Sequence, residues 1–416
     1  MPGFVNRFGR YDSKLRQAIT NRHVLWMHAV SVGEVNVCTQ LIAALEVRMP
    51  NLKIVVSTTT TTGMGVLQSK LPSHVSRIYY PIDTRRWVTR ALAIIRPEAI
   101  VLIEAEIWPN FLWRAQDMGM PLFLVNARLS DSSYRGYRRF GFLFRKLFAS
   151  FVAVGVQNEQ DAEKLRLLGC RQEALHVVGS LKFDAAPLDE KRRLNVPAML
   201  AQLGVPAGAR VLVGGSTHKG EDAILAEQFL RLRVRFPDLF LILVPRHFER
   251  SREVGRELKN LGVQFVYRTE IVANAEYRKG EIDCLLVNTT GELKHFYECA
   301  SVIFVGKSLT AEGGQNPIEP GALGKSMVFG PNMQNFAEVV RQFLTRDGAL
   351  QARDAADLEK IIGDLLEDEP RRQQLGRNAR AIVRENQGAI ERTAEMIVKH
   401  LDRGEFYVAP RKELAS

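Results

Sequence analysis

The chain has 416 residues, of which 46% are hydrophobic and 25% are charged, and its mean hydropathy is −0.10. These values exclude a disordered, collagenous or coiled-coil chain, and at roughly 150 residues per domain they predict two or three domains, each with its own core. The 57 Lys and Arg residues outnumber the 46 Asp and Glu residues, and the resulting net charge of +11 favours an anionic partner: nucleic acid, a membrane surface or a phosphorylated substrate.

The first half of the chain alternates short β-rich runs with longer amphipathic segments. A β-rich run at 23–30 is followed by Gly33 and by a helical pattern from Val35 to about Met49. Near-continuous Val, Ile and Leu runs separated by helices are typical of a parallel sheet that is covered on both faces. Residues 1–184 are therefore predicted to form one doubly wound α/β domain, whose further strands lie at 52–60, 98–106, 120–127, 151–158 and 174–180.

The pattern changes at 183–208, where prolines and mixed charge without a strand pattern predict a linker. It then restarts with six strands, predicted at 210–216, 239–246, 263–268, 283–290, 301–308 and 326–331. Charged amphipathic helices are predicted at 352–402. We therefore expect a second Rossmann-like domain over 185–400, a tail at 401–416, and a central ligand cleft that the two domains face.

Polar residues crowd where the predicted strands end, which is where doubly wound sheets bind ligands. After the first strand, Glu34 follows Gly33, and a glycine lets the backbone approach a ligand closely. A carboxylate at that place is a candidate general base. The alternative is an acidic residue in the first turn of a helix, where the helix dipole favours it. The sequence leaves both interpretations open.

Two carboxylates, Glu104 and Glu106, end a buried strand and share one of its faces, because side chains alternate along a strand. Ionised carboxylates at the end of an apolar run are costly unless they are paired or functional. A structural ion pair and a catalytic role are therefore both open. Asn126 and Arg128 follow the next strand, and Lys182 follows the last one. Lys182 is either a salt-bridge partner in the linker or a ligand for an anion.

Three further groups of polar residues follow strands in the second half. Residues Gly214 to His218 form a candidate anion loop between a strand and a helix, although they match neither the Walker A pattern nor G-x-G-x-x-G. Arg246 and His247 end the next strand, and a glycine turn at 290–292 follows another. These residues are candidates for contacts with an anionic ligand.

The segment at 313–319 has the best-defined pattern of the second half. Asn316 is a natural N-cap, Pro317 then stands at N1 and Glu319 at N3, which is a capping box behind a diglycine. Plain helix capping is one interpretation. The other is an anion-accepting helix start with a carboxylate suited to ribose hydroxyls, which indicates nucleotide-sugar rather than dinucleotide chemistry.

Arginines alternate with aromatic residues at 134–150, over about four helical turns. Basic residues with Phe and Leu at this density are typical of an interfacial segment that meets anionic lipid. A stacking surface for RNA and a buried helix with a basic solvent face are the alternatives. Since no nucleic-acid module accompanies the segment, we expect no nucleic-acid partner.

The cysteines predict a reducing compartment and no metal site, because they form neither a C-x-x-C pair nor a zinc spacing. They are Cys38, Cys170, Cys284 and Cys299. No apolar run approaches the ~18 residues that a membrane span needs, and the basic start of the chain lacks the apolar stretch of a signal peptide. We therefore expect a soluble cytosolic protein that is able to sit on a membrane surface.

Seven short motifs, taken together and in this order, closely resemble one family: HAVSVGE, EAEIWPN, NARLS, GSLKFD, GSTHKGE, VPRH and EGGQNPIEP. Over about positions 8 to 400 the chain is similar to the Kdo (3-deoxy-D-manno-octulosonic acid) transferases of lipopolysaccharide synthesis. The resemblance implies a GT-B glycosyltransferase that moves Kdo from CMP-Kdo to the primary hydroxyl of the lipid A precursor, lipid IVA, with inversion. It implies neither a cofactor nor a metal bound by the protein.

The resemblance also implies roles for individual residues. Glu34 would be the general base, and Glu104 and Lys182 would stabilise the transition state. A lysine makes physical sense near the Kdo carboxylate or the leaving phosphate, whereas Glu104 would have to hold a cation or orient a base. The residues that would bind CMP are Pro245, Arg246, Thr290, Gly291, Glu292, Asn316, Pro317, Ile318 and Glu319.

The implied location is the cytoplasmic face of the bacterial inner membrane, with peripheral attachment. The excess positive charge would then dock a bis-phosphorylated lipid in an anionic leaflet. Two features depart from the family pattern: the chain opens near RFGRY without the usual apolar anchor, and Lys307 stands where many relatives carry glycine. Another GT-B transferase, a nucleotide-sugar epimerase, and a membrane or RNA adaptor without catalysis are the competing functions.

Overall fold

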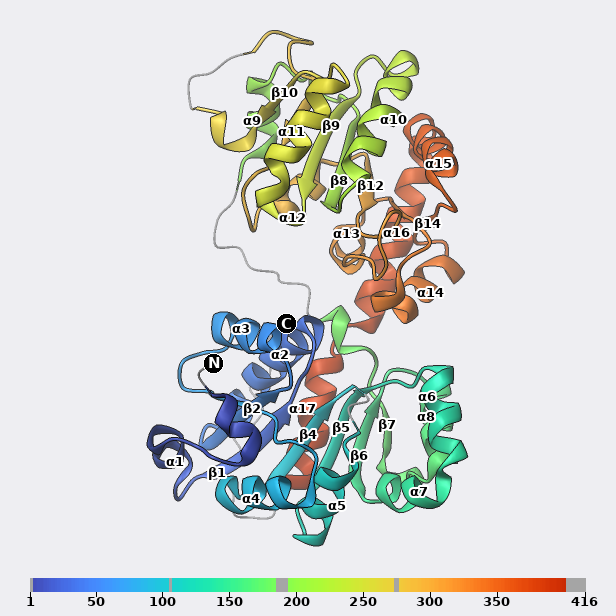
Figure 1. Cartoon of the computed structure of the whole chain (residues 1–416). Helices are drawn as coiled ribbons and strands as arrows, with labels where there is room; N and C mark the ends of the chain where they lie inside the picture. Colours follow the sequence, from blue (N-terminus) through green and yellow to red (C-terminus); the bar gives the residue numbers. More distant parts are fainter. Residues whose placement is uncertain (1–2, 105–106, 185–193, 273–276, 402–416) are drawn as a thin grey trace. The chain divides into compact units, whose positions relative to one another are not determined.

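The computed structural model describes residues 3–104, 107–184, 194–272 and 277–401. The chain forms two compact units, each of which is described by itself (Figure 1). Unit 1 comprises residues 1–185 together with 386–416, and unit 2 comprises residues 186–385. Both units are built on a seven-stranded parallel sheet, so the doubly wound α/β class predicted from the sequence is confirmed.

The sheet of unit 1 has the strand order β3-β2-β1-β4-β5-β6-β7. The order reverses between β1 and β4, and such a switch point is where doubly wound sheets open a crevice for ligands beyond the carboxyl ends of their strands. The strands are β1 (His23–His28), β2 (Leu52–Thr58), β3 (Ser76–Tyr79), β4 (Ala99–Ile103), β5 (Leu122–Ala127), β6 (Phe151–Val156) and β7 (Leu175–Val177).

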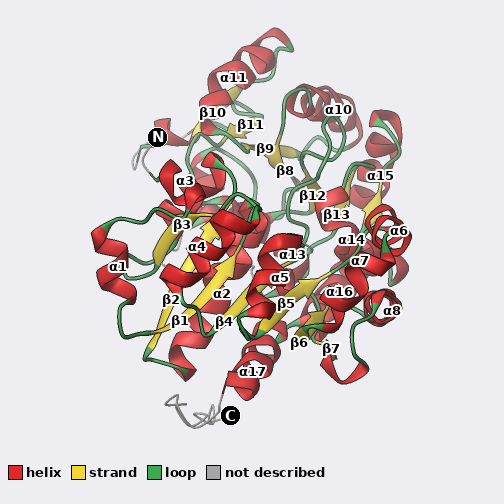
Figure 2. Cartoon of the chain, turned by 60° about the horizontal axis from the view of Figure 1, so that its bottom comes forward, coloured by secondary structure: helices red, strands yellow, loops and turns green. Residues whose placement is uncertain are grey.

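Helices cover both faces of this sheet (Figure 2). Along β1, Leu25 and Met27 belong to the core with α2, whereas Val24 and Trp26 belong to the core with α4, as strand alternation requires. The helical elements are η1 (Phe4–Phe8), α1 (Ser13–Ile19), α2 (Val32–Arg48), α3 (Thr61–Lys70), α4 (Arg85–Ile95), α5 (Pro109–Asp117), α6 (Asp131–Arg139), α7 (Gly141–Ala149), α8 (Glu159–Leu168), η2 (Gln172–Ala174) and η3 (Leu181–Phe183).

The last helix, α17 (Ala389–Leu401), belongs to unit 1 and not to the second domain, where the predicted boundaries of 185–400 had placed it. Its apolar residues join the core that α2 forms with the sheet, and the helix packs against α2 and β6. The Asp184 carboxylate fixes the entry to the helix by accepting the N–H groups of Gly388 at 2.8 Å and Ile390 at 2.7 Å. Amphipathic periodicity identifies an apolar face but does not say which sheet that face will cover.

The sheet of unit 2 has the order β10-β11-β9-β8-β12-β13-β14, which reverses between β8 and β12. Its strands are β8 (Val211–Thr217), β9 (Phe240–Pro245), β10 (Phe265–Tyr267), β11 (Cys284–Leu286), β12 (Val302–Val305), β13 (Met327–Phe329) and β14 (Leu350–Gln351). The helical elements are α9 (Val196–Gln202), α10 (Glu221–Arg235), η4 (Phe248–Arg250), α11 (Ser251–Asn260), η5 (Arg268–Glu270), α12 (Leu293–Cys299), α13 (Ile318–Ala322), η6 (Gln334–Phe336), α14 (Ala337–Thr345), α15 (Ala355–Glu367) and α16 (Glu369–Asn386).

Three elements differ from the sequence-based expectation. Strands β3 and β14 were not predicted, because their four and two residues are too short to show a strand pattern. The segment predicted as a linker contains α9, which packs against α12 in unit 2, and its residues 185–193 lie outside the described part. The tail predicted at 401–416 lies outside it as well, apart from Leu401. No helix within the described ranges is long and apolar enough to cross a membrane.

Candidate active site

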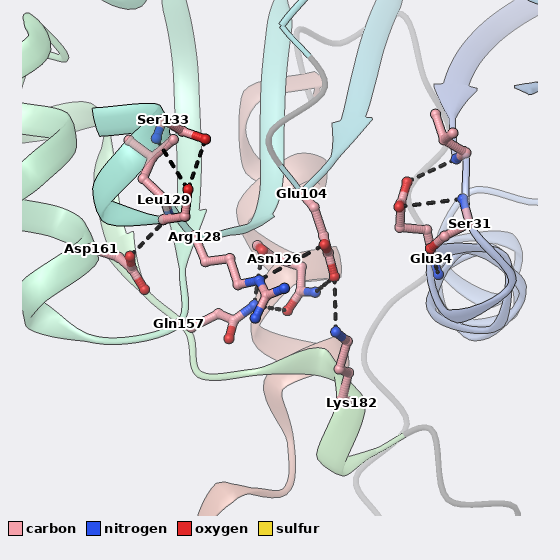
Figure 3. Close-up of polar contacts among 12 residues, drawn as sticks. Ser31, Glu34, Glu104, Asn126, Arg128, Leu129, Ser133, Gln157, Asp161 and Lys182 are labelled. Carbon is pink, nitrogen blue, oxygen red and sulfur yellow. Dashed lines mark hydrogen bonds and ion pairs between the residues drawn. The ribbon is translucent and has the colours of Figure 1, made fainter. Parts of the chain in front are cut away.

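In unit 1 two of the three predicted catalytic residues follow the two strands that flank the switch point. Glu34 lies in the first turn of α2, after β1, and Glu104 directly follows β4. Asn126 is the last residue but one of β5, Gln157 directly follows β6, and Lys182 lies on η3, after β7. Five neighbouring strands therefore present polar side chains at one edge of the sheet (Figure 3).

Glu34 is the N3 residue of a capping box with Ser31. Its Oε2 accepts the N–H of Val30 at 2.8 Å, its Oε1 accepts the N–H of Ser31 at 3.3 Å, and its own N–H donates to Ser31 Oγ at 3.2 Å (Figure 3). The residue is only 6% exposed. Glu34 is therefore an acidic residue in the first turn of a helix, as one of the two interpretations had it, and the capping box with Ser31 was not predicted. This capping is compatible with a base role, because each carboxylate oxygen offers two lone pairs and the backbone holds the group in one orientation.

Glu104 and Lys182 form an ion pair. Lys182 Nζ lies 3.0 Å from Glu104 Oε1, and the two side chains are 16% and 19% exposed. The Glu104 backbone is in the left-handed region at φ 61°, and its N–H donates to the carbonyl of Val125 at 2.9 Å. This strained conformation turns the chain at the end of β4 and aims the carboxylate along the sheet edge. Such strain in a residue other than glycine is concentrated at functional sites. Glu106 lies outside the described residues.

Asn126 and Gln157 complete the cluster, and Gln157 was missed by the sequence analysis. Asn126 Nδ2 donates to Glu104 Oε1 at 3.4 Å, and Gln157 Nε2 donates to both Asn126 Oδ1 and the Asn126 carbonyl at 3.1 Å. Arg128 Nε lies 3.9 Å from Glu104 Oε2. The signal that points to Gln157 is a polar residue directly after a buried strand, the same signal that identified its neighbours.

This arrangement places the Lys182 ammonium beside the Glu104 carboxylate, and both side chains are largely buried. Lys182 brings three N–H donors and a full positive charge to a place where little water screens it. Such a group stabilises negative charge that develops on a bound substrate. Within the described ranges, no group of three or more His, Cys, Asp and Glu side chains is arranged to hold a metal ion.

In unit 2 the switch point is held together by Glu221, a fully buried carboxylate at the start of α10. It accepts the N–H of His218 at 2.8 Å, on the loop after β8. It also accepts three consecutive N–H groups after β12, from Lys307 at 2.7 Å, Ser308 at 2.9 Å and Leu309 at 3.0 Å. The His218 N–H of the predicted anion loop is therefore taken by a side chain of the protein itself.

Polar side chains surround this loop. His218 Nε2 lies 3.2 Å from Gln315 Nε2, and the rings of His218 and His247 are 5.9 Å apart. Partial burial lowers the pKa of His218, and nearby Lys307 acts in the same direction. A neutral histidine offers one donor and one acceptor at this place. Lys307 has φ 57°, so the lysine at this family glycine position keeps a left-handed backbone.

The predicted capping box at Asn316 and Glu319 is wrong in its details. The helix α13 begins at Ile318, with Pro317 as the N-cap residue and no side-chain cap. Asn316 Oδ1 accepts the N–H of Ile318 at 3.0 Å, and its Nδ2 donates to Glu319 Oε1 at 3.2 Å. Burial raises the pKa of Glu319, while the Asn316 hydrogen bond and the charges of Arg246 and Lys294 oppose the rise. In the predicted capping box Glu319 would accept the backbone N–H of Asn316. In the structure it accepts the side-chain amide of Asn316 instead.

The other predicted CMP-binding residues also lie at carboxyl ends of strands. Pro245 ends β9 and is buried, whereas the next residue, Arg246, is exposed. Gly291 has φ 83° in the turn before α12. Glu292 accepts the hydroxyl of Thr289 at 2.5 Å and pairs with Arg268 Nε at 3.3 Å. Thr290 in the same turn is exposed.

A buried charge pair beside the loop was not anticipated. Asp222 is fully buried, accepts the Thr217 hydroxyl at 2.5 Å, and lies 3.0 Å from Arg250 Nη2. Burial raises its pKa to about 6, although the Thr217 hydrogen bond and the Arg250 charge oppose the rise. A strongly displaced pKa at a switch point is the kind of feature that marks functional sites.

The basic, aromatic segment at 134–150 is not one continuous helix. It is divided between α6 and α7, with Phe140 at the break. Phe140, Phe142 and Leu143 are 49%, 79% and 42% exposed. Exposed basic residues accompany them on both helices, namely Arg135, Arg138, Arg139, Arg145 and Lys146. Only the end of α7, at Leu147 and Phe148, is buried, so the segment is a surface and not a core helix.

A family model and two related proteins carry the same description. Residues 3–185 match the family model for 3-deoxy-D-manno-octulosonic-acid transferase (kdotransferase). A 3-deoxy-D-manno-octulosonic acid transferase of Haemophilus influenzae is 30% identical over 381 residues, which cover 91% of this chain and 87% of that relative. A second, from Bordetella pertussis, is 33% identical over 399 residues, covering 94% and 90%.

Among solved structures, the UDP-GlcNAc 2-epimerase from Neisseria meningitidis bound to UDP-GlcNAc has a TM-score of 0.58. It is 14% identical and covers 91% of this chain and 100% of that one. At this identity the likeness concerns the fold alone. It agrees with two Rossmann-like units of the GT-B kind.

Proposed function

The chain belongs to the 3-deoxy-D-manno-octulosonic acid transferase family, and from this premise we propose that it moves Kdo from CMP-Kdo to the primary hydroxyl of the lipid A precursor. The observation that carries the proposal is the polar cluster at the switch point of unit 1. There Glu34, Glu104 and Lys182, the three residues that the family resemblance singles out, follow strands β1, β4 and β7 at the same edge of one sheet. The reaction would invert the anomeric centre, because in a single displacement the acceptor oxygen bonds to the anomeric carbon on the face opposite to the departing phosphate oxygen.

Glu34 would act as the general base. Its carboxylate would take the proton of the acceptor hydroxyl while that oxygen forms a bond to the anomeric carbon of Kdo. The bond from the anomeric carbon to the phosphate oxygen breaks, and CMP leaves with the electron pair. The N–H groups of Val30 and Ser31 support this role, since they hold the carboxylate in a single orientation before substrate arrives.

Lys182 would stabilise negative charge on the Kdo carboxylate or on the departing phosphate. Glu104 supports that role by fixing the ammonium at 3.0 Å, so that no reorganisation is needed during the reaction. This assignment gives Glu104 the part of a positioning residue, and it removes the need for a cation at that carboxylate. In line with the family expectation, we propose that transfer uses no metal bound by the protein.

Unit 2 would bind the CMP moiety of the donor. Arg246 is exposed at the end of β9 and is suited to the phosphate. Glu319 and Asn316 lie at the start of α13, where a carboxylate and an amide can bind ribose hydroxyls. The turn at 290–292, together with Pro245, Pro317 and Ile318, completes the proposed nucleotide site.

The acceptor would reach the enzyme from a membrane surface. The exposed Phe140, Phe142 and Leu143, with the surrounding arginines of α6 and α7, fit an interfacial contact with anionic lipid. We therefore propose a peripheral protein at the cytoplasmic face of the bacterial inner membrane, whose excess of positive charge attracts a bis-phosphorylated lipid.

The decisive experiment incubates the full chain with CMP-Kdo and lipid IVA and measures the mass of the lipid product and the release of CMP. We expect the product mass to increase by whole Kdo units, and CMP to be released only when the lipid is present. Release of CMP without lipid, or conversion of a nucleotide sugar in its absence, would instead favour an epimerase or another GT-B transferase. Undetectable binding of CMP by the wild type would contradict the donor assignment.

A further inference from the structure

The side chain of Asn126 contacts residues of three other parts of unit 1: the end of β4, the end of β6, and η3. Its Nδ2 reaches Glu104 at the end of β4. Its Oδ1 accepts Gln157 Nε2 after β6 and the backbone N–H of Leu181 on η3, both at 3.1 Å (Figure 3). The residue is fully buried, so water does not substitute for these contacts.

The contact with Leu181 matters because the next residue is Lys182. A hydrogen bond to the Leu181 N–H fixes the backbone of η3, and therefore fixes the point from which the lysine side chain reaches Glu104. The contact through Nδ2 fixes the other member of the pair, the Glu104 carboxylate. One side chain thus holds both ends of the ion pair.

A primary amide meets both requirements at this place. It donates to a carboxylate through its nitrogen and accepts backbone and side-chain N–H groups through its oxygen, without adding a charge. The backbone of Asn126 is left-handed at φ 53°, a region that asparagine tolerates better than most residues. Glu104 shares this conformation at φ 61°, so two adjacent strands end in the same uncommon geometry.

We propose that Asn126 is a positioning residue for transfer: it sets the geometry of the Glu104–Lys182 pair before substrate binds. Gln157 helps to hold Asn126 in place by donating hydrogen bonds to its side-chain oxygen and to its backbone carbonyl. The inference rests on the proposed function, because it assumes that the pair stabilises the transition state. It adds a residue that acts on Lys182 in two ways, through the backbone of η3 and through Glu104.

The test uses the Asn126→Asp variant of the full chain. Aspartate has the same shape and can still accept the Leu181 N–H, but it loses the donor to Glu104 and sets a second carboxylate against it. We expect kcat to fall about 100-fold near pH 8, because the pair is displaced, while the KM for CMP-Kdo stays within about threefold.

The defect should shrink at lower pH. Two adjacent carboxylates raise the pKa of one of them, so protonation near pH 6 restores an O–H donor between positions 126 and 104. The described charged groups that face the pair are Lys182 on η3 and Arg128 after β5. We expect the ratio of variant to wild-type kcat to rise several-fold from about pH 8 to about pH 6. A ratio that does not change with pH, or a defect confined to KM, would overturn the proposal.

Two companion variants separate this effect from unspecific damage. Asn158→Asp adds the same charge at the N-cap of α8, where Asn158 accepts the Asp161 N–H and an aspartate caps equally well. Its kcat should stay within about twofold of wild type at both pH values. Asn126→Asp combined with Glu104→Gln exchanges donor and acceptor, and should recover the Tm that Asn126→Asp loses while kcat stays low.

The two proposals fail in different ways. Absence of transfer by the wild type would contradict the proposed function. Failure of the exchanged pair to recover the Tm would contradict the contact on which the inference about Asn126 depends, whatever the reaction is.

Discussion

Lys182 Nζ lies 3.0 Å from Glu104 Oε1, although Glu104 follows β4 and Lys182 follows β7. In the sheet β5 and β6 separate these two strands. The amide of Asn126 on β5 contacts Glu104, and the amide of Gln157 after β6 contacts Asn126. The pair is therefore a product of strand order. Each residue is the ion-pair partner that the sequence could not name for the other.

We expect Glu34→Gln to abolish transfer, because a carboxamide cannot take the proton of the attacking hydroxyl. The amide oxygen can still accept one of the N–H groups of Val30 and Ser31. The free energy of unfolding should therefore fall by only about 1 kcal/mol. Turnover at saturating substrates and chemical unfolding measure the two effects separately.

Ser31→Ala is the matched control for this experiment. It removes the hydroxyl that accepts the Glu34 N–H at 3.2 Å, and so breaks the same capping box while keeping the carboxylate. We expect a similar loss of stability, about 1 kcal/mol, with turnover preserved within a few-fold. If both variants lose turnover equally, Glu34 serves only as a helix cap.

Glu104→Gln and Lys182→Met should each lower kcat by about 10²- to 10³-fold, since either change dissolves the charged pair. The double variant should be little worse than either single variant, because residues that act as a unit are strongly non-additive. Steady-state kinetics of the four proteins give the coupling. Additive losses would mean that the two side chains act independently.

The exposed pair of Arg235 and Glu367 provides the comparison for this cycle. These side chains lie 2.6 Å apart but are 54% and 68% exposed. Their coupling in the free energy of unfolding should be at most about 0.5 kcal/mol, because water and salt screen the pair. A larger value there would weaken the interpretation of the buried pair.

Asp222 should make the stability of unit 2 dependent on pH. Its pKa is raised from 3.8 to about 6 in the folded protein, so folding binds its proton more tightly than the unfolded chain does. The resulting contribution, about 3 kcal/mol, is fully present below about pH 4 and is lost as the pH rises through about 6. Urea unfolding of the wild type and of Asp222→Asn at several pH values measures it.

Wild type and Asp222→Asn should respond differently to pH. Over the same range, the stability of the wild type should fall relative to that of Asp222→Asn, which carries no titrating group at this position. A wild type that gains stability relative to the variant between about pH 4 and about pH 6 would show that the Arg250 charge and the Thr217 hydroxyl outweigh burial at this site.

The surface of α6 and α7 should bind anionic vesicles. Replacing Arg135, Arg138 and Arg139 together by Ser should weaken binding to vesicles that contain acidic phospholipid by about 1 kcal/mol for each arginine, or about 100-fold in total. Phe142→Ser should weaken it further, because the 79% exposed ring is available for the interface. Vesicle sedimentation at two salt concentrations measures the contribution of the arginines and that of the Phe142 ring.

The control changes the net charge by the same amount elsewhere. Arg231, Arg235 and Arg353 lie on unit 2 and pair with Glu359, Glu367 and Asp357. Their replacement by Ser should leave vesicle affinity within about threefold of the wild type. Equal losses in both triple variants would mean that net charge, and not this surface, governs attachment.

Most of the fold was predictable because buried parallel strands are continuous apolar runs. The runs at β4, β5, β9 and β12 are short, apolar and bounded by helices, so their existence and their class follow from local sequence. The strands of two and four residues, β14 and β3, have no such signal. They are strands because a neighbour supplies their hydrogen bonds.

The candidate site was predictable as a set of positions and not as a set of contacts. Glu34, Glu104, Asn126 and Lys182 were all identified as polar residues at the ends of strands. The partners were missed: Gln157 behind Asn126, Arg268 on Glu292, and the backbone N–H groups on Glu221. The capping box was assigned to Glu319, whereas the structure forms it at Glu34.

By itself the sequence determined the alternation of strands and helices, the residues that stand at the strand ends, and the family to which the ordered motifs belong. Tertiary structure alone decided that α17 covers the sheet of unit 1, that Glu104 pairs with Lys182, and that Asn126 contacts both Glu104 and the backbone next to Lys182. The physical reason is the same in each case. Periodicity fixes which face of an element is apolar and which residue ends it, but the partner of that face or that residue depends on the order in which the strands assemble.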